Sequence, residues 1–150
     1  MKGAMVKIYI ASSWKNQHAV EMLSLLLRKK GHEVLSFVEK AIADEGRTNI
    51  KFDFEQWINS EDGQQKFIYD TDGATKSDLV IYIGPSGTDA WAEVGAAWGC
   101  EITIFGLWAK GESAGLMRRM MEGWYTDYKD LLENVDRISK QHTDQINGKK

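Results

Sequence analysis

The chain has 150 residues, of which 19 are Lys or Arg and 22 are Asp or Glu, so its formal net charge is −3. This length predicts one domain over residues 1–150, with a substantial core. No basic run or stripe occurs apart from the two terminal lysines, so we expect no nucleic-acid polymer as a partner. No apolar run is long enough to span a bilayer, so we expect no membrane segment.

The single cysteine, Cys100, excludes an intrachain disulfide and fits a reducing compartment. The first residues show a strand pattern and not that of a signal peptide, and we expect a cytoplasmic protein. Cys100 is expected to be a buried small apolar group. The three histidines do not cluster with carboxylates or with Cys100 at metal-ligand spacing, so we predict no metal site and no cofactor.

Hydrophobic periodicity predicts strands alternating with helices along the chain. In chain order we expect a strand over 6–11, an amphipathic helix ending at Gly31, a strand over 33–38, a loop over 41–52, a helical segment over 52–69 interrupted near Asp62-Gly63, a strand over 79–83, a helix over 88–98, a strand over 102–107, a short helix over 116–121 and a final helix over 130–140.

This order implies a parallel sheet with right-handed crossovers. The continuously apolar residues 79–83 suit the centre of a sheet that is covered on both faces. The predicted fold class is therefore α/β, a three-layer, doubly wound parallel sheet of the flavodoxin-like kind. Residues 141–150 are polar, and we expect them to be a frayed tail.

The strand over 79–83 is followed by a Gly/Ser/Pro turn and then by a helix that carries Glu93. Open α/β sheets bind ligands outside the carboxyl ends of their strands, which makes Glu93 a candidate reactive group. Most helix carboxylates are solvated surface groups, so the spacing by itself favours that simpler interpretation. Asp89 shares the face of Glu93 and would complement the helix dipole. The predicted core-facing stripe is Ala90, Trp91, Val94 and Trp98.

The turn after the first strand is a second candidate site. Ser12, Ser13 and the free N–H groups at the start of the helix could hold an anion such as a phosphate, with Lys15 adding charge. The alternative is an ordinary helix N-cap beside an exposed lysine, which is the more common case. No Walker loop and no GxGxxG fingerprint is present.

A third candidate lies just before the central strand, where Asp70 and Asp72 stand two residues apart. The simpler interpretation of these aspartates is turn and cap chemistry, which Asp favours.

Three short motifs in this order resemble the nucleoside 2-deoxyribosyltransferase superfamily. They are Tyr9 in Lys7-Ile-Tyr-Ile-Ala-Ser-Ser-Trp14, the acidic Asp70-Thr-Asp-Gly73, and the helical Glu93-Val-Gly-Ala-Ala97. The resemblance covers residues 6–121. It implies a nucleoside or nucleotide as the small-molecule partner. It also implies a homodimer or larger homo-oligomer whose pockets are completed across the interface.

The resemblance also implies roles for these residues. Glu93 would attack the anomeric carbon of the sugar and form a covalent glycosyl-enzyme, as the carboxylate of a retaining glycosidase does. Tyr9 would orient Glu93, and Asp70 or Asp72 would contact or protonate the leaving base. A second base would resolve the intermediate in a transferase, and water would do so in a hydrolase.

One branch of this superfamily hydrolyses deoxynucleoside 5′-monophosphates. Its phosphate-binding Ser and Arg correspond to Ser13 and Lys15, and lysine can still bind phosphate as a point charge. Ser86 and Gly87, in the turn before the helix, would add contacts. Ser12 and Trp14 complete the predicted substrate-binding residues of the first turn.

Two departures from the family pattern bear on the reaction. The transferases carry a sugar-holding Asp six residues before the nucleophile, where this chain has Gly87, and Asp89 is the nearest substitute. They also place an Asn near the position of Gly115, and none is near here. These differences favour a nucleotide-processing or inactive relative over true base exchange.

Two alternative functions stay open. A TIR-like, NAD-cleaving enzyme is one, because Trp91-Ala-Glu93 weakly resembles the active helix of those domains. A non-catalytic nucleotide-binding module is the other, and the missing Asp and Asn motivate it.

Overall fold

The centre of the computed structural model, which describes residues 3–40 and 53–148, is a five-stranded sheet in the order β2-β1-β3-β4-β5. Every neighbouring pair of strands is parallel. The strands are β1 (Lys7–Ala11), β2 (Glu33–Ser36), β3 (Leu79–Ile83), β4 (Thr103–Leu107) and β5 (Gly123–Tyr125).

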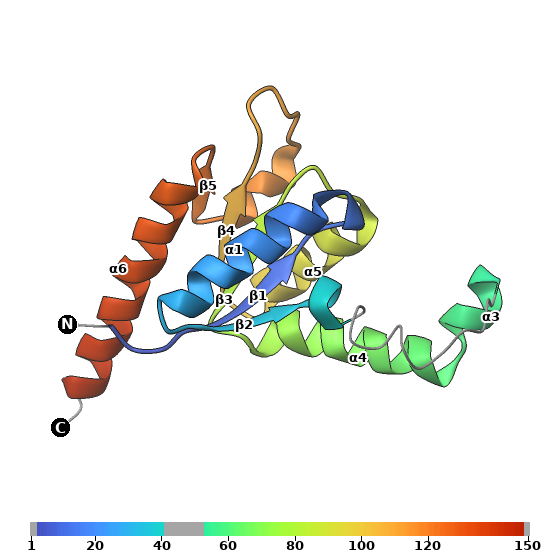
Figure 1. The fold of residues 1–150 in the computed structure, drawn as a ribbon, viewed down its shortest axis with the longest axis horizontal. Coiled ribbons are helices and arrows are strands. Elements are labelled where there is room, and N and C mark those ends of the chain that lie inside the picture. The colour runs from blue at the N-terminus through green and yellow to red at the C-terminus, as the bar shows by residue number, and fades with distance from the viewer. Residues whose placement is uncertain (1–2, 41–52, 149–150) are drawn as a thin grey trace.

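Helices cover both faces of this sheet (Figure 1). The α-helices are α1 (Gln17–Lys29), α3 (Phe54–Ile58), α4 (Glu61–Lys76), α5 (Thr88–Gly99) and α6 (Tyr128–Asn147), and the 3₁₀ helices are η1 (Trp14–Asn16) and η2 (Leu116–Met120). Helices α1 and α6 form the layer on one face of the sheet, and α4 and α5 form the layer on the other. The predicted three-layer, flavodoxin-like α/β fold is confirmed.

Alternation along the strands divides the core in two, because successive side chains of a strand point to opposite faces. Ile8, Ile10 and Ile81 face α1 and α6. Tyr9 and Tyr82 face α4 and α5. All five residues of β3 are buried, as the continuous apolar run predicted. The aromatic side chain of Tyr9 therefore enters the layer that also contains Glu93.

The second strand is shorter than predicted. It ends at Ser36, and residues 37–40 are helical, so that Phe37 and Val38 are buried against the α1 side of the sheet. These apolar residues fit a strand by sequence pattern, but helical backbone brings both of them into the same core. The predicted loop over 41–52 lies outside the described residues.

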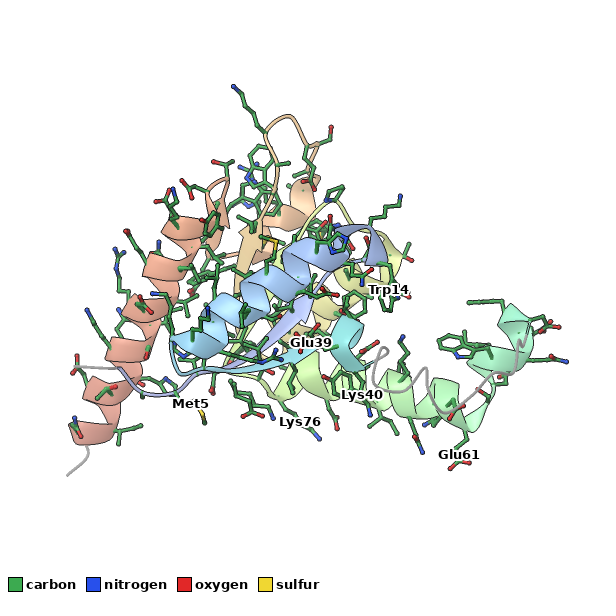
Figure 2. All side chains as sticks on the ribbon, viewed as in Figure 1. Met5, Trp14, Glu39, Lys40, Glu61 and Lys76 are labelled. Carbon is green, nitrogen blue, oxygen red and sulfur yellow. The ribbon has the colours of Figure 1, made fainter. Side chains whose placement is uncertain are left out.

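The predicted interruption at Asp62-Gly63 is also misplaced. The chain breaks at Asn59 and Ser60, and Ser60 caps α4 by accepting a hydrogen bond from the backbone N–H of Gly63 at 3.1 Å. The helix α4 then runs without a break to Lys76, so Asp70 and Asp72 lie on a helix and not in a turn. Figure 1 shows α4 extending beyond the sheet with α3 at its far end, and Figure 2 shows Glu61 and Lys76 at its two ends.

The C-terminal part differs from prediction in two ways. Strand β5 was not predicted, because its three residues carry too little pattern. The last helix begins at Tyr128 and reaches Asn147, so residues 141–147, which we expected to be frayed, are helical. Contacts with the N-terminal segment explain this: the backbone N–H of Ala4 donates to Thr143 Oγ1 at 2.7 Å, and the hydroxyl of Ser139 donates to the Ala4 carbonyl.

The helix α5 packs on the sheet through Ala90, Val94 and Ala97. The predicted stripe was therefore wrong at Trp98, which is 59% exposed. Position 98 keeps the helical spacing of positions 90, 94 and 97, but it lies in the last turn of α5, which ends at Gly99. Cys100 is exposed as well, contrary to expectation, because it follows the last turn of α5.

A glycine sets how closely α4 approaches β1. A Cβ built on Gly73 would lie 2.7 Å from Cε2 of the Tyr9 ring. The helix backbone therefore rests directly on the phenol. This close approach is what places Asp70, three residues earlier on α4, beside the same ring.

We expect Gly73→Ala to destabilise the protein by about 1–3 kcal/mol, because the added methyl group overpacks the contact with Tyr9. The control is Gly95→Ala on α5, where no atom lies within 4 Å of the built Cβ. That change should be neutral or stabilising by up to about 1 kcal/mol, since alanine favours helix. Urea unfolding measures both. Equal stability of the two variants would contradict the tight contact.

Candidate active site

Three side chains from three elements interact on the α4–α5 face of the sheet. Tyr9 is fully buried on β1, whereas Asp70 on α4 and Glu93 on α5 are half-buried. The hydroxyl of Tyr9 interacts with both carboxyl groups. Tyr9 Oη and Asp70 Oδ1 are nevertheless buried without a hydrogen bond of normal geometry. Buried polar atoms seldom lack a partner, so these atoms are suited to receive a polar ligand.

Burial raises the pKa of Glu93 from its ordinary 4.5 to about 8. The charge of the Asp70 carboxylate contributes to this rise and that of Asp89 adds to it, whereas the neighbouring Tyr9 hydroxyl and the charge of Lys66 oppose it. Desolvation disfavours the charged form, and a neighbouring like charge does the same. Glu93 therefore holds a proton at neutral pH more readily than an exposed glutamate does.

Burial also raises the pKa of Asp70, to about 6. Lys66 and Tyr9 oppose this rise in pKa, and Asp89 adds to it. The pKa of Tyr9 lies well above its usual value because of burial and the charges of Glu93 and Asp70. Tyr9 is therefore a neutral hydrogen-bond donor throughout the physiological range. The two carboxyl groups together share one proton near neutral pH.

Lys66 belongs to this group and was missed from the sequence. It lies four residues before Asp70 on α4, is half-buried, and lowers the pKa of both carboxyl groups. The i,i+4 spacing of a lysine and an aspartate is a recognisable signal for such a pair. The signal is usable only once the helix is known to continue through both positions.

The side chain of Asp72 pairs with another residue of α4 and not with Tyr9. Its carboxylate forms an ion pair with Lys76 at 3.1 Å, one turn further along α4, and 49% of its side chain is exposed. Of the two aspartates that the sequence left as alternatives, α4 therefore presents Asp70 to Tyr9.

Of the residues predicted to bind substrate in the turn after β1, Ser12 has a structural contact and Trp14 and Lys15 are exposed. Ser12 is buried, and its hydroxyl donates to the carbonyl of Ile83 at 2.7 Å, so it fastens β1 to the end of β3. Lys15 is exposed. Trp14 is 44% exposed at the start of η1 (Figure 2), where its ring meets Phe37 edge to face at 5.7 Å.

Ser13 begins η1 without capping it, and its hydroxyl is buried without a partner. The ordinary N-cap alternative is therefore not realised at this serine. Asn16, which sequence reasoning did not single out, donates to the carbonyls of Ile83 at 3.2 Å and Pro85 at 2.8 Å. It holds the turn after β3 against the turn after β1.

The turn before α5 carries the remaining predicted residues. The Ser86 hydroxyl is buried without a partner, and Gly87 is an exposed N-cap of α5. Asp89 is exposed in the first turn of α5, and its charge raises the pKa of both Asp70 and Glu93. Ser13, Ser86 and Asp89 therefore lie around the carboxyl ends of β1 and β3, where a ligand was expected.

Within residues 3–40 and 53–148, no group of three or more His, Cys, Asp or Glu side chains is placed to hold a metal ion. None of the helices in this described part is both long enough and apolar enough to cross a membrane.

No family model matches the sequence, and no curated protein does. Among solved structures, the 2-deoxyribosyltransferase of the psychrotolerant bacterium Bacillus psychrosaccharolyticus superposes with a TM-score of 0.66 at 21% identity, over 83% of this chain and 89% of that one. The chain has the fold of the nucleoside 2-deoxyribosyltransferases. The fold that the sequence resemblance implied is thereby confirmed.

Two further solved structures share this 2-deoxyribosyltransferase fold. The CMP N-glycosidase BcmB of Clostridium botulinum has a TM-score of 0.54 at 20% identity, over 87% of this chain and 98% of that one. A conserved protein from Enterococcus faecalis V583 has a TM-score of 0.59 at 16% identity, over 89% of this chain and 99% of that one.

The raised pKa of Glu93 makes stability depend on pH. The folded protein keeps a proton that the unfolded chain releases near pH 4.5, so stability falls as pH rises from about 4.5 to about 8. Glu93→Gln should therefore be more stable than the parent at pH 9, by on the order of 1–4 kcal/mol, and nearly equal to it at pH 4.

Urea unfolding at the two pH values measures this difference. Asp72→Asn is the matched control, because this exposed carboxylate should show no comparable gain at pH 9. A Glu93→Gln variant with the same stability advantage at both pH values would show that burial does not hold Glu93 protonated.

Proposed function

We propose that this protein cleaves the N-glycosidic bond of a nucleoside or nucleotide, with Glu93 as the nucleophile. The observation that supports this most is the meeting of Glu93, Asp70 and Tyr9 in one partly buried group of shifted pKa values. Perturbed carboxyl groups above the end of a parallel sheet are typical of reactive sites. The fold shared with a 2-deoxyribosyltransferase and a CMP N-glycosidase adds support.

The reaction needs one ionised and one protonated carboxyl group. Glu93 holds the shared proton in the free protein, because its pKa is the higher of the two. Tyr9 interacts with both groups, so its hydroxyl offers a route by which that proton moves to Asp70. A substrate whose leaving base accepts a proton from Asp70 favours the productive arrangement, in which Glu93 is the carboxylate.

In the first step, a carboxylate oxygen of Glu93 forms a bond to C1′ of the sugar while the bond from C1′ to the base nitrogen breaks. The base takes the proton of Asp70 as it leaves. In the second step, Asp70 removes a proton from water, or from an incoming base, and this acceptor displaces Glu93 from C1′. Two displacements at C1′ retain its configuration, as in retaining glycosidases.

Homo-oligomeric assembly, cytoplasmic location and a single domain over residues 1–150 accompany this proposal as predictions. Size-exclusion chromatography with light scattering tests the assembly directly. A monomer at micromolar concentration would contradict it.

We expect the protein to release free base from at least one member of a panel of ribonucleosides, 2′-deoxynucleosides, their 5′-monophosphates and NAD. Glu93→Gln should lose at least about 1,000-fold in kcat, because the nucleophile is removed. Asp72→Asn, the matched control on α4, should keep its rate within about threefold of the parent. Chromatography of the released base measures both, and activity that survives in Glu93→Ala would exclude Glu93 as the nucleophile.

The rate should depend on pH as a bell. Above pH 8 the shared proton is lost from the two carboxyl groups, and below pH 6 a second proton is added, so kcat/KM falls on both sides. In Asp70→Asn the repelling charge beside Glu93 is gone, so the pKa of Glu93 should fall. The surviving activity should then follow the ionisation of Glu93 alone and lose the alkaline limb, because position 70 no longer has a proton to release. An alkaline limb that persists in this variant would contradict the coupling.

A further inference from the structure

Glu112 lies at the carboxyl end of β3, although it comes from the segment between β4 and η2. Its Oε2 accepts a hydrogen bond from the backbone N–H of Ala109 at 3.2 Å, which fixes the side chain on its own loop. A Cβ built on Gly84 would lie 2.9 Å from Cδ of Glu112. The carboxyl group therefore occupies the space that any other side chain at position 84 would fill.

The face on which Glu112 lies follows from strand alternation. Tyr82 faces α5, so Gly84, two residues later, presents its missing side chain to the same layer. Burial is the largest cause of the raised pKa of Tyr82, and the charge of Glu112 is the second. Glu112 thus shares the α4–α5 side of the sheet with Tyr9 and Glu93.

An aromatic wall borders this carboxylate. The Tyr82 ring packs against Trp91 at 4.7 Å and stacks with Trp124 at 6.3 Å, and Trp108 stacks with Trp124 at 5.6 Å. The indole N–H of Trp108 and the hydroxyl of Ser86 are buried without partners. A sugar could pack against such rings while its hydroxyl groups donate hydrogen bonds to the carboxylate.

Asp70 and Glu93 meet at Tyr9 on β1, whereas Glu112 lies over Gly84 at the end of the neighbouring strand β3. There the backbone N–H of Gly84 donates to the carbonyl of Leu107 on β4 at 3.0 Å. With C1′ at Glu93 and the base toward Asp70, the opposite end of the sugar extends toward Gly84 and Glu112.

We propose that Glu112 is a substrate-binding residue that accepts a hydrogen bond from the 5′-hydroxyl of a nucleoside and disfavours the 5′-monophosphate. This inference rests on the proposed function and names its substrate class. A carboxylate binds a hydroxyl donor but repels a phosphate, and the charge of Asp89 adds to that repulsion. Lys110, on the same loop as Glu112, and Lys15, after β1, are exposed, and the guanidinium of Arg118 lies over the Trp124 ring, 5.2 Å from its centre.

The test compares base release from four 2′-deoxynucleosides and from their 5′-monophosphates. The parent protein should prefer the nucleoside by at least about tenfold in kcat/KM, and Glu112→Gln should reduce that preference at least about fivefold, mainly through KM. Gly84→Ala should act in the same direction, because its methyl group displaces the carboxyl group. Glu133→Gln, on the exposed side of α6, is the matched control and should leave the preference unchanged.

A parent preference for the monophosphate, or a preference that Glu112→Gln leaves within about twofold, would overturn this role while base release itself still supports the proposed function. If the parent releases no base, the proposed function fails, and binding then decides the role of Glu112. Tryptophan fluorescence of the Glu93→Gln protein titrated with each compound measures it. The role is supported if the Glu93→Gln protein binds the nucleoside selectively and the double variant Glu93→Gln/Glu112→Gln does not. Unselective or undetectable binding by the Glu93→Gln protein overturns it.

Discussion

The contact between the Tyr9 ring and the backbone of α4 at Gly73 is the constraint on which the site depends. Because Gly73 has no side chain, the helix rests on the phenol and carries Asp70 into the layer that α5 supplies with Glu93. The result is a phenol and two carboxyl groups removed from water together. Desolvation is the largest cause of the raised pKa in all three groups, so these pKa shifts originate in packing.

This arrangement lowers the stability of the fold and keeps a proton between the two carboxyl groups. A carboxyl group that keeps its proton at neutral pH weakens the fold as pH rises, yet a proton shared by two carboxyl groups is what cleavage of a glycosidic bond requires. Lys66 moderates the repulsion between the carboxylates. The buried hydroxyls of Ser13 and Ser86 and the free Asp70 oxygen are further polar groups whose partners a bound substrate would provide.

The two halves of the site are held differently. On the β1 side, Ser12 and Asn16 tie the turns after β1 and β3 together by hydrogen bonds. On the β4 side, aromatic rings pack in sequence, and Glu112 lies over Gly84 at their border. Both sets of contacts border the space in which the proposed function places the substrate.

The sequence by itself determined the α/β alternation, the two-sided burial of β3 and the positions of Tyr9 and Glu93, because hydrophobic period and strand–turn–helix order are local properties. The tertiary structure alone decided between Asp70 and Asp72, since that choice depends on which side of an unbroken α4 meets β1. It also showed that Lys66 lies near the two carboxyl groups, that Asn16 joins the turns after β1 and β3, and that Glu112 lies over Gly84. These relations arise from contacts between elements, and no local pattern records how closely two elements pack.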